Sequence, residues 1–86
     1  MIDELALQVI NEYGLRNQLK HLSGEYYELV ESILMDDSDE NIAEEIADMM
    51  TILKTIQLKF GINDLYIRKI MVDKLMRERD RINENH

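Results

Sequence analysis

Two short acidic motifs are the residues in this chain best suited to chemistry. Glu25 and Glu28 enclose two tyrosines, and Glu45 and Asp48 enclose Ile-Ala. On a helix, residues three apart project from the same face with their Cβ atoms about 5–6 Å apart. Each motif therefore places two carboxylates side by side. Carboxylate oxygens suit a hard divalent cation, so we expect the four acids to hold Mg²⁺, with Mn²⁺ as a possible substitute.

The charge around these motifs supports a bound cation. Residues 25–48 contain ten acidic side chains and no Lys or Arg. Four carboxylates that converge in a partly dry groove repel one another unless a cation lies among them. Paired acids in an acidic protein are most often a solvated surface. Two pairs on neighbouring helices, with no base between them, favour the metal site instead.

A cationic stripe near the end of the chain complements the acids. Lys74, Arg77 and Arg81 continue the apolar line of Ile67 and Ile70 at alternating three- and four-residue steps. Arg offers a bidentate fork to phosphate and Lys a point charge, so these residues could bind the phosphates of a ligand. Ordinary surface ion pairs with the neighbouring acids, each worth little, are the alternative.

Two further polar residues lie on the line of the first acidic motif. Gln18 and His21 precede Glu25 and Glu28 at helical spacing. Gln18 could bind the edge of a base or ribose, and His21 could orient a ligand or a water molecule. A lone His on a helix surface is more often simply exposed.

The elements that must position these residues are helices. The chain has no Pro and only three Gly, and its apolar residues recur at three- and four-residue steps. We expect helices over 2–13, 15–35, 39–60 and from 63 or 64 to about 83, separated at Gly14, at the polar segment 36–41 and at Gly61. The predicted core stripes of the two middle helices are Leu15, Leu19, Leu22, Tyr26, Leu29 and Ile33, and Ile42, Ile46, Met49, Leu53, Ile56 and Phe60. On the last helix, Met71, Leu75 and Ile82 are expected to hold it against the others. The predicted fold is an all-α four-helix bundle.

Length and composition limit the class of protein. The 86 residues form one domain (1–86) with a net charge of −8 and no Cys. A chain this short buries only about 60% of its unfolded surface, so we expect a homodimer or homotetramer to complete the bundle. The acidic balance argues against nucleic acid as a partner. No apolar run suits a membrane span and no basic leader begins the chain, so a soluble, cytoplasmic protein is expected.

Two other metal sites do not fit the spacing. A di-iron carboxylate bundle needs Glu-x-x-His pairs, and neither His21 nor His86 follows a Glu at that distance. An EF-hand loop starting at Asp37 would have Ile42 at its required Gly position.

With its Glu-x-x-Glu and Glu-x-x-Asp motifs sixteen residues apart, the chain resembles the MazG-like branch of the all-α nucleoside triphosphate pyrophosphohydrolases. The segments EEIADMMTILKTIQLKFGI (44–62) and KLMRERDRI (74–82) add to the resemblance, which covers about residues 15–82.

The resemblance implies a fold and a reaction. Members of this family are helical oligomers that hold Mg²⁺ against a triphosphate with the four acids. The resemblance implies that the metal ligands are Glu25, Glu28, Glu45 and Asp48, and that Glu25 or Glu28 activates water. It also implies that Lys74, Arg77 and Arg81 neutralise the charge of the pyrophosphate. The expected reaction gives a nucleoside monophosphate and pyrophosphate, in housekeeping of the nucleotide pool. The short chain implies a nucleoside pocket that is shallow or shared with a partner copy. The alternative from another class is a non-enzymatic oligomeric adaptor with an acidic interaction face.

Overall fold

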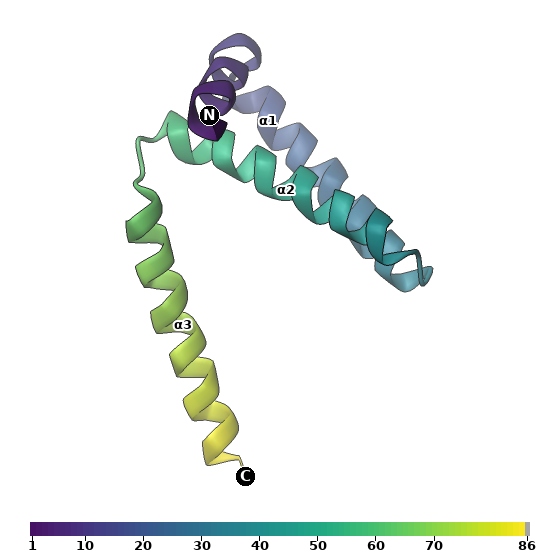
Figure 1. Cartoon of the computed structure of the whole chain (residues 1–86), viewed down its shortest axis with the longest axis vertical. Helices are drawn as coiled ribbons and strands as arrows, with labels where there is room; N and C mark the ends of the chain where they lie inside the picture. Colours follow the sequence, from purple (N-terminus) through teal and green to yellow (C-terminus); the bar gives the residue numbers. More distant parts are fainter. Residues whose placement is uncertain (86) are drawn as a thin grey trace.

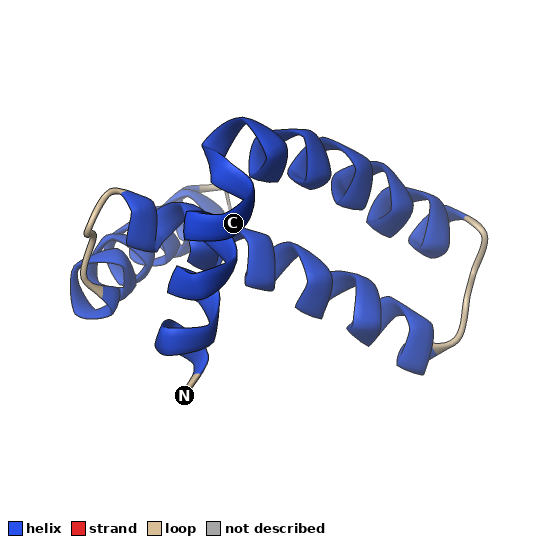
Figure 2. Cartoon of the chain, turned by 90° about the horizontal axis from the view of Figure 1, so that it is seen from above, coloured by secondary structure: helices blue, strands red, loops and turns tan. Residues whose placement is uncertain are grey.

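The computed structural model describes residues 1–85, which form three helices joined by short turns. They are α1 (Ile2–Leu34), α2 (Asp39–Lys59) and α3 (Asp64–Glu84), and residues 1–85 contain no strand. α1 and α2 lie side by side, whereas α3 leaves the end of α2 at an angle (Figure 1). Figure 2 shows α1 and α2 joined by the turn at one end. The prediction of an all-α fold is confirmed.

The turn between α1 and α2 forms where the polar segment predicted it. Ser38 caps α2, because its side chain accepts a hydrogen bond from the backbone N–H of Asn41 at 3.2 Å. The carboxylate of Asp37 accepts a second from the backbone N–H of Ser38 at 2.8 Å. Asp36 adopts a φ of 58°, a value that Asp tolerates better than most residues. These bonds satisfy the free backbone groups at the turn, so the two helices form an antiparallel hairpin.

The predicted break at Gly14 is a kink within α1. Gly14 has φ 84° and ψ 163°, outside the helical region, and the chain resumes the helix directly after it. A residue with a Cβ is strained at this φ, so glycine is the residue that permits the kink. The segment before the kink turns back across α2, where Ala6 and Ile10 are buried with Ile52. These three are the only buried apolar residues among residues 1–85.

Half of the predicted core stripe of each middle helix is wrong. The residues that face the partner helix within the hairpin are spaced three and four apart, and polar side chains occupy several of these positions. We call them the seam; they are Leu15, Gln18, Leu22, Glu25, Leu29 and Ser32 of α1, and Ile42, Glu45, Met49, Ile52, Thr55 and Ile56 of α2. The other predicted core residues, Leu19, Tyr26, Ile33, Ile46, Leu53 and Phe60, are exposed. Apolar content alone did not show which of two neighbouring stripes meets the partner helix.

The start of α3 is bound to the end of α2. Lys54 forms ion pairs with Asp3 at 2.9 Å and with Asp64 at 2.6 Å. Gln57 donates to the same carboxylate of Asp64 at 2.5 Å and to the backbone carbonyl of Ile62 at 2.9 Å. Gly61, with φ 64°, supplies the change of direction between the helices. This arrangement, which we call the elbow, holds α3 away from its own hairpin.

Beyond the elbow, α3 packs against neither α1 nor α2 within residues 1–85. Met71, Leu75 and Ile82, which were expected to hold this helix against the others, are each more than half exposed. The radius of gyration is 15.7 Å, whereas a compact chain of this length has about 12 Å. A single copy therefore does not form the expected four-helix bundle. No helix in the described part of the chain has the length and apolar content to span a membrane.

Candidate metal centre

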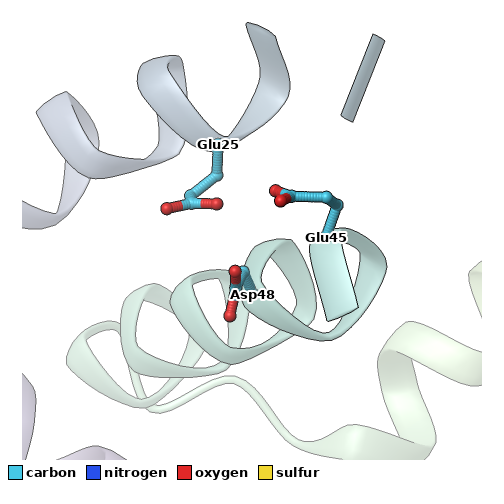
Figure 3. Close-up of side chains that lie close together, drawn as sticks. All are labelled: Glu25, Glu45 and Asp48. Atoms are coloured by element: carbon cyan, nitrogen blue, oxygen red, sulfur yellow. The ribbon is translucent and has the colours of Figure 1, made fainter. Parts of the chain in front are cut away.

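Three of the four predicted metal ligands meet between α1 and α2. Glu25 projects from α1, and Glu45 and Asp48 project from α2 toward it (Figure 3). One carboxylate oxygen from each lies within 4.8 Å of the other two. That spacing is short enough for all three to contact one cation, given metal–oxygen distances of about 2.0–2.6 Å.

The seam explains why these side chains converge. Glu25 and Glu45 occupy seam positions, where an ordinary hairpin would place Leu or Ile, and both are half-buried. Asp48 follows Glu45 by three residues and lies at the exposed edge of the same face. Their helices are held in register by the capped turn at one end and the buried Gln18–Thr55 contact at the other. The carboxylates are thus placed by rigid elements on both sides.

Burial and mutual repulsion alter the titration of two of these acids. Burial, together with the negative charges of Glu28, Asp48 and Glu45, raises the pKa of Glu25 from 4.5 to about 7. Burial and the charges of Glu28 and Asp48 also raise the pKa of Glu45. Both raised pKa values mean that the charged forms of these two carboxylates are disfavoured, at a free-energy cost, in the folded chain. A cation at this place would remove the cost.

Two orphaned oxygens test whether the residues fit a metal ion. Oε2 of Glu25 and Oε2 of Glu45 are both shielded from solvent, and neither has a hydrogen-bond partner in residues 1–85. Buried carboxylate oxygens are normally paired, because an unpaired one loses its hydration without compensation. A hard cation would supply the missing partner of both atoms. The donor set, which is all oxygen and all anionic, fits Mg²⁺ or Mn²⁺.

The fourth predicted ligand lies beside this group. Glu28 is exposed, and it is not among the three carboxylates that meet within 4.8 Å. It lines an open cavity of about 260 Å³ that extends from Glu45 toward the turn, past Glu31 and Ser32. Its charge still acts on the cluster, because it contributes to the raised pKa of both Glu25 and Glu45. Glu28 therefore lies at the edge of the site, next to Glu25 and Glu45, where a ligand or a water molecule could reach it.

Gln18 and His21 lie together at a second cavity. This cavity has a volume of about 370 Å³ and lies beside the kink of α1, one turn before Glu25. Gln18 is buried, and its Oε1 accepts a hydrogen bond from the fully buried hydroxyl of Thr55 at 3.0 Å. Its amide nitrogen donates to Asn17 at 3.2 Å. Gln18 is thus a fixed wall of the cavity, whereas His21 is exposed at it.

The sequence reasoning missed other walls of this second cavity. Val9, Tyr13 and Asn17 complete its lining. Asn17 lies four residues before His21, so it could have been found from the helical line of His21. Tyr13 lies across the kink at Gly14, where that line is interrupted. Val9 lies before the kink as well, so neither Tyr13 nor Val9 could have been found from helical spacing alone.

The predicted cations do not meet the acids within this chain. Lys74, Arg77 and Arg81 are exposed on the outer half of α3, and α3 packs against neither helix of the hairpin in the described residues. Arg81 forms an ion pair with Glu78 on its own helix. The expected juxtaposition of acids and cations is therefore absent from residues 1–85 of one copy.

Comparison with models of protein families, with curated proteins and with solved structures found no match for this chain.

Proposed function

We propose that this chain is a Mg²⁺-dependent nucleoside triphosphate pyrophosphohydrolase. The observation that carries the proposal is the convergence of Glu25, Glu45 and Asp48, with two shielded oxygens that have no hydrogen-bond partner within residues 1–85. Mg²⁺ in proteins is commonly held by a few carboxylates together with the phosphates of a substrate. The resemblance of the two acidic motifs to those of the MazG-like family points to the triphosphate as that substrate.

The residues around the cluster suit the parts of a nucleoside triphosphate. The carboxylate cluster would hold the cation that carries the phosphates, and the open cavity beside Glu28 gives them room. The second cavity, at His21 and Tyr13, lies on the same side of the hairpin and is large enough for a base and sugar. The nucleoside would therefore lie toward the kink of α1 and the phosphates toward the turn.

The proposed reaction is attack of water on the α-phosphorus. Glu28 is proposed to take the proton of this water; its position at the edge of the cluster, outside the three converging carboxylates, supports this role. The bond from the α-phosphorus to the bridging oxygen then breaks, which leaves a nucleoside monophosphate and pyrophosphate. A metal ion, when bound, supplies charge neutralisation of the phosphates. Glu25 is the other candidate for the base, because its carboxylate lies in the same cluster.

The oligomer is part of the proposal. Lys74, Arg77 and Arg81 are proposed to neutralise charge on the leaving pyrophosphate, which requires them to come from another copy because α3 leaves its own hairpin. The small core and the exposed apolar residues on all three helices support a homodimer or homotetramer.

The proposal is tested with a panel of ribo- and deoxyribonucleoside triphosphates and Mg²⁺. We expect equal amounts of nucleoside monophosphate and pyrophosphate from at least one nucleotide, and none from the Glu45→Gln variant. Magnesium–nucleotide binding in calorimetry without product would indicate a binding protein instead. The absence of both binding and product would favour the adaptor.

A further inference from the structure

The hairpin has an apolar face that nothing covers in residues 1–85. Large apolar side chains recur every seven residues along both helices, and each is at least 43% exposed. We call this surface the hairpin apolar face; it consists of Leu19, Tyr26 and Ile33 of α1, and Ile46, Leu53 and Phe60 of α2. Equivalent positions of two antiparallel helices lie on the same side of their seam, so the six residues form one surface.

This surface lies on the side of the hairpin opposite the carboxylate cluster. Tyr26 and Ile46 come one residue after the seam residues Glu25 and Glu45, a rotation of about 100° in one direction. Glu28 and Asp48 come three residues after the same seam residues, which is a rotation of about 60° in the other direction. Packing on the apolar face would therefore leave the acidic face open to metal and nucleotide, and the α3 cations proposed to reach that face would then come from a further pair of copies, as in a homotetramer.

α3 carries an apolar stripe that also lacks a partner. Ile67, Met71, Leu75 and Ile82 follow one side of the helix at spacings of four, four and seven. The last three are 54%, 65% and 56% exposed. Because the elbow directs α3 away from the hairpin, this stripe has no surface to meet within its own chain.

The surface area of one copy indicates how much a partner must cover. The accessible surface is 7,325 Å², whereas a folded monomer of 10.2 kDa exposes about 5,300 Å². The excess is about 2,000 Å² per copy, so a dimer that removed it would bury about 4,000 Å² in total. That area lies in the range of obligate dimers, which bury about 2,000–5,000 Å². A second copy can therefore account for the uncovered surface.

The charges indicate which part of the second copy fits the hairpin. Residues 1–60 carry thirteen acidic and four basic side chains, so two hairpins packed together would repel each other. Residues 64–84 carry six basic and five acidic side chains. A helix with this balance meets an acidic hairpin without that repulsion. One contact of this kind would also cover both uncovered surfaces, whereas contact between two hairpins would leave α3 exposed.

We propose that α3 of one copy packs its apolar stripe against the hairpin apolar face of a second copy, so that two copies exchange their α3 helices. Exchange of an identical element is a common route to symmetric dimers. The elbow at Lys54, Gln57 and Asp64 sets the direction that makes the exchange possible. This contact does not depend on hydrolysis, and its test uses no nucleotide.

Thiol cross-linking tests the contact directly, because the chain has no Cys. Leu53 is at the middle of the hairpin apolar face and Leu75 is near the middle of α3, so a cross-link between them depends little on the direction of docking. Leu53→Cys chains and Leu75→Cys chains, mixed and treated with a short bis-maleimide, should give a mixed dimer of about 20 kDa. Each variant alone should give little dimer.

Other products would overturn the proposal. A dimer from Leu75→Cys alone would place α3 against α3, and one from Leu53→Cys alone would place hairpin against hairpin. A chain with both substitutions that cross-links only within itself would show that α3 closes on its own hairpin. A wild-type chain that sediments as a monomer at the concentrations used would also contradict it.

Sedimentation of two matched variants gives an independent test. Leu75→Glu places a charge in the apolar stripe and should shift the dimer toward monomer by at least tenfold in dissociation constant. Tyr66→Glu is the control, since Tyr66 is 62% exposed, Leu75 is 65% exposed, and the nine-residue spacing sets them on opposite sides of α3. Equal dissociation of both variants, or of neither, would refute the assigned contact.

Discussion

Replacing Glu25 by Gln should stabilise the metal-free protein at pH 8. Glu25 is half-buried among three other acids, and its pKa is about 7 in the folded chain against 4.5 for an ordinary Glu. Between these two values the folded chain keeps a proton that the unfolded chain has released, so stability falls as the pH rises from about 4.5 to 7. Above pH 7 Glu25 is charged in the folded chain too, so the full free-energy cost of holding that charge lowers the stability. Gln is nearly isosteric and carries no charge, so it removes that cost.

The size of the effect follows from the pKa. The difference corresponds to about 3 kcal/mol at 1.36 kcal/mol for each pH unit. Because Glu25 is only half-buried and solvent screens its charge, we expect about 1–2 kcal/mol. For a chain of this size each kcal/mol raises the melting temperature by about 4–8 °C. At pH 5, where Glu25 is already protonated in the folded chain, the substitution should change little.

Thermal unfolding followed by circular dichroism, in EDTA and at fixed protein concentration, measures this difference. Glu12→Gln is the matched control, since Glu12 is an exposed acid on the same helix and should shift stability by less than about 0.5 kcal/mol. Excess Mg²⁺ should stabilise the wild type at pH 8 and stabilise Glu25→Gln much less. If Glu25→Gln melted below the wild type in EDTA at pH 8, or raised the melting temperature equally at pH 5, the reasoning about the cluster would be refuted.

Three further substitutions separate the parts of the account. Asp48→Asn should lower Mg²⁺ affinity in calorimetry and reduce turnover on the order of 100-fold. The melting temperature of this variant in EDTA should not fall. Unchanged Mg²⁺ affinity would show that Asp48 is not part of the metal site. Thr55→Val should cost about 1–3 kcal/mol in urea unfolding, because the buried Oε1 of Gln18 loses its donor; a neutral result would show that water replaces it. Arg77→Ala should reduce turnover about tenfold or more with little change in Mg²⁺ affinity. Arg79→Ala is the control, because Arg79 lies off the cationic stripe, and it should leave turnover unchanged. Equal losses of turnover from both substitutions would assign α3 a structural role alone.

The helices and their ends could be read from the sequence because local chemistry determines them. Ser38 caps α2, and Asn63 caps α3 by accepting from the backbone N–H of Leu65 at 2.7 Å, near where the polar segments predicted helix starts. Gly14 and Gly61 adopt positive φ values at the predicted breaks. Each of these features involves residues within one turn of one another.

The packing of the helices could not be read in the same way. Each middle helix offers two neighbouring apolar stripes, and the hydrophobic pattern does not distinguish a stripe that meets the partner helix from one left for another copy. The hairpin places the charged residues Glu25 and Glu45 in its seam and leaves the apolar residues Tyr26 and Ile46 exposed, which is the reverse of what their hydrophobicity predicts. Such a departure from the local rule is expected where side chains serve a site rather than a core.

The candidate site was partly predictable, because some of its geometry is set within one helix and the rest depends on how the helices pack. The three-residue spacing within each acidic motif is local, so the sequence placed Glu45 beside Asp48 on one face of a helix. The meeting of Glu25 with that pair depends on the register of the hairpin, which the length of the turn made plausible. The distance of Lys74 and Arg77 from the acids depends on the direction of α3, which the elbow decides through the ion pairs of Lys54.

The most direct test of the central claim is the identity of the phosphate product. The wild-type chain with Mg²⁺ and the nucleoside triphosphates, assayed separately for pyrophosphate and for orthophosphate, should release pyrophosphate in equal amount with nucleoside monophosphate, and EDTA should abolish the release. Release of orthophosphate with a nucleoside diphosphate, or no product from any nucleotide at saturating Mg²⁺, would contradict the assignment of the carboxylate cluster to pyrophosphohydrolysis.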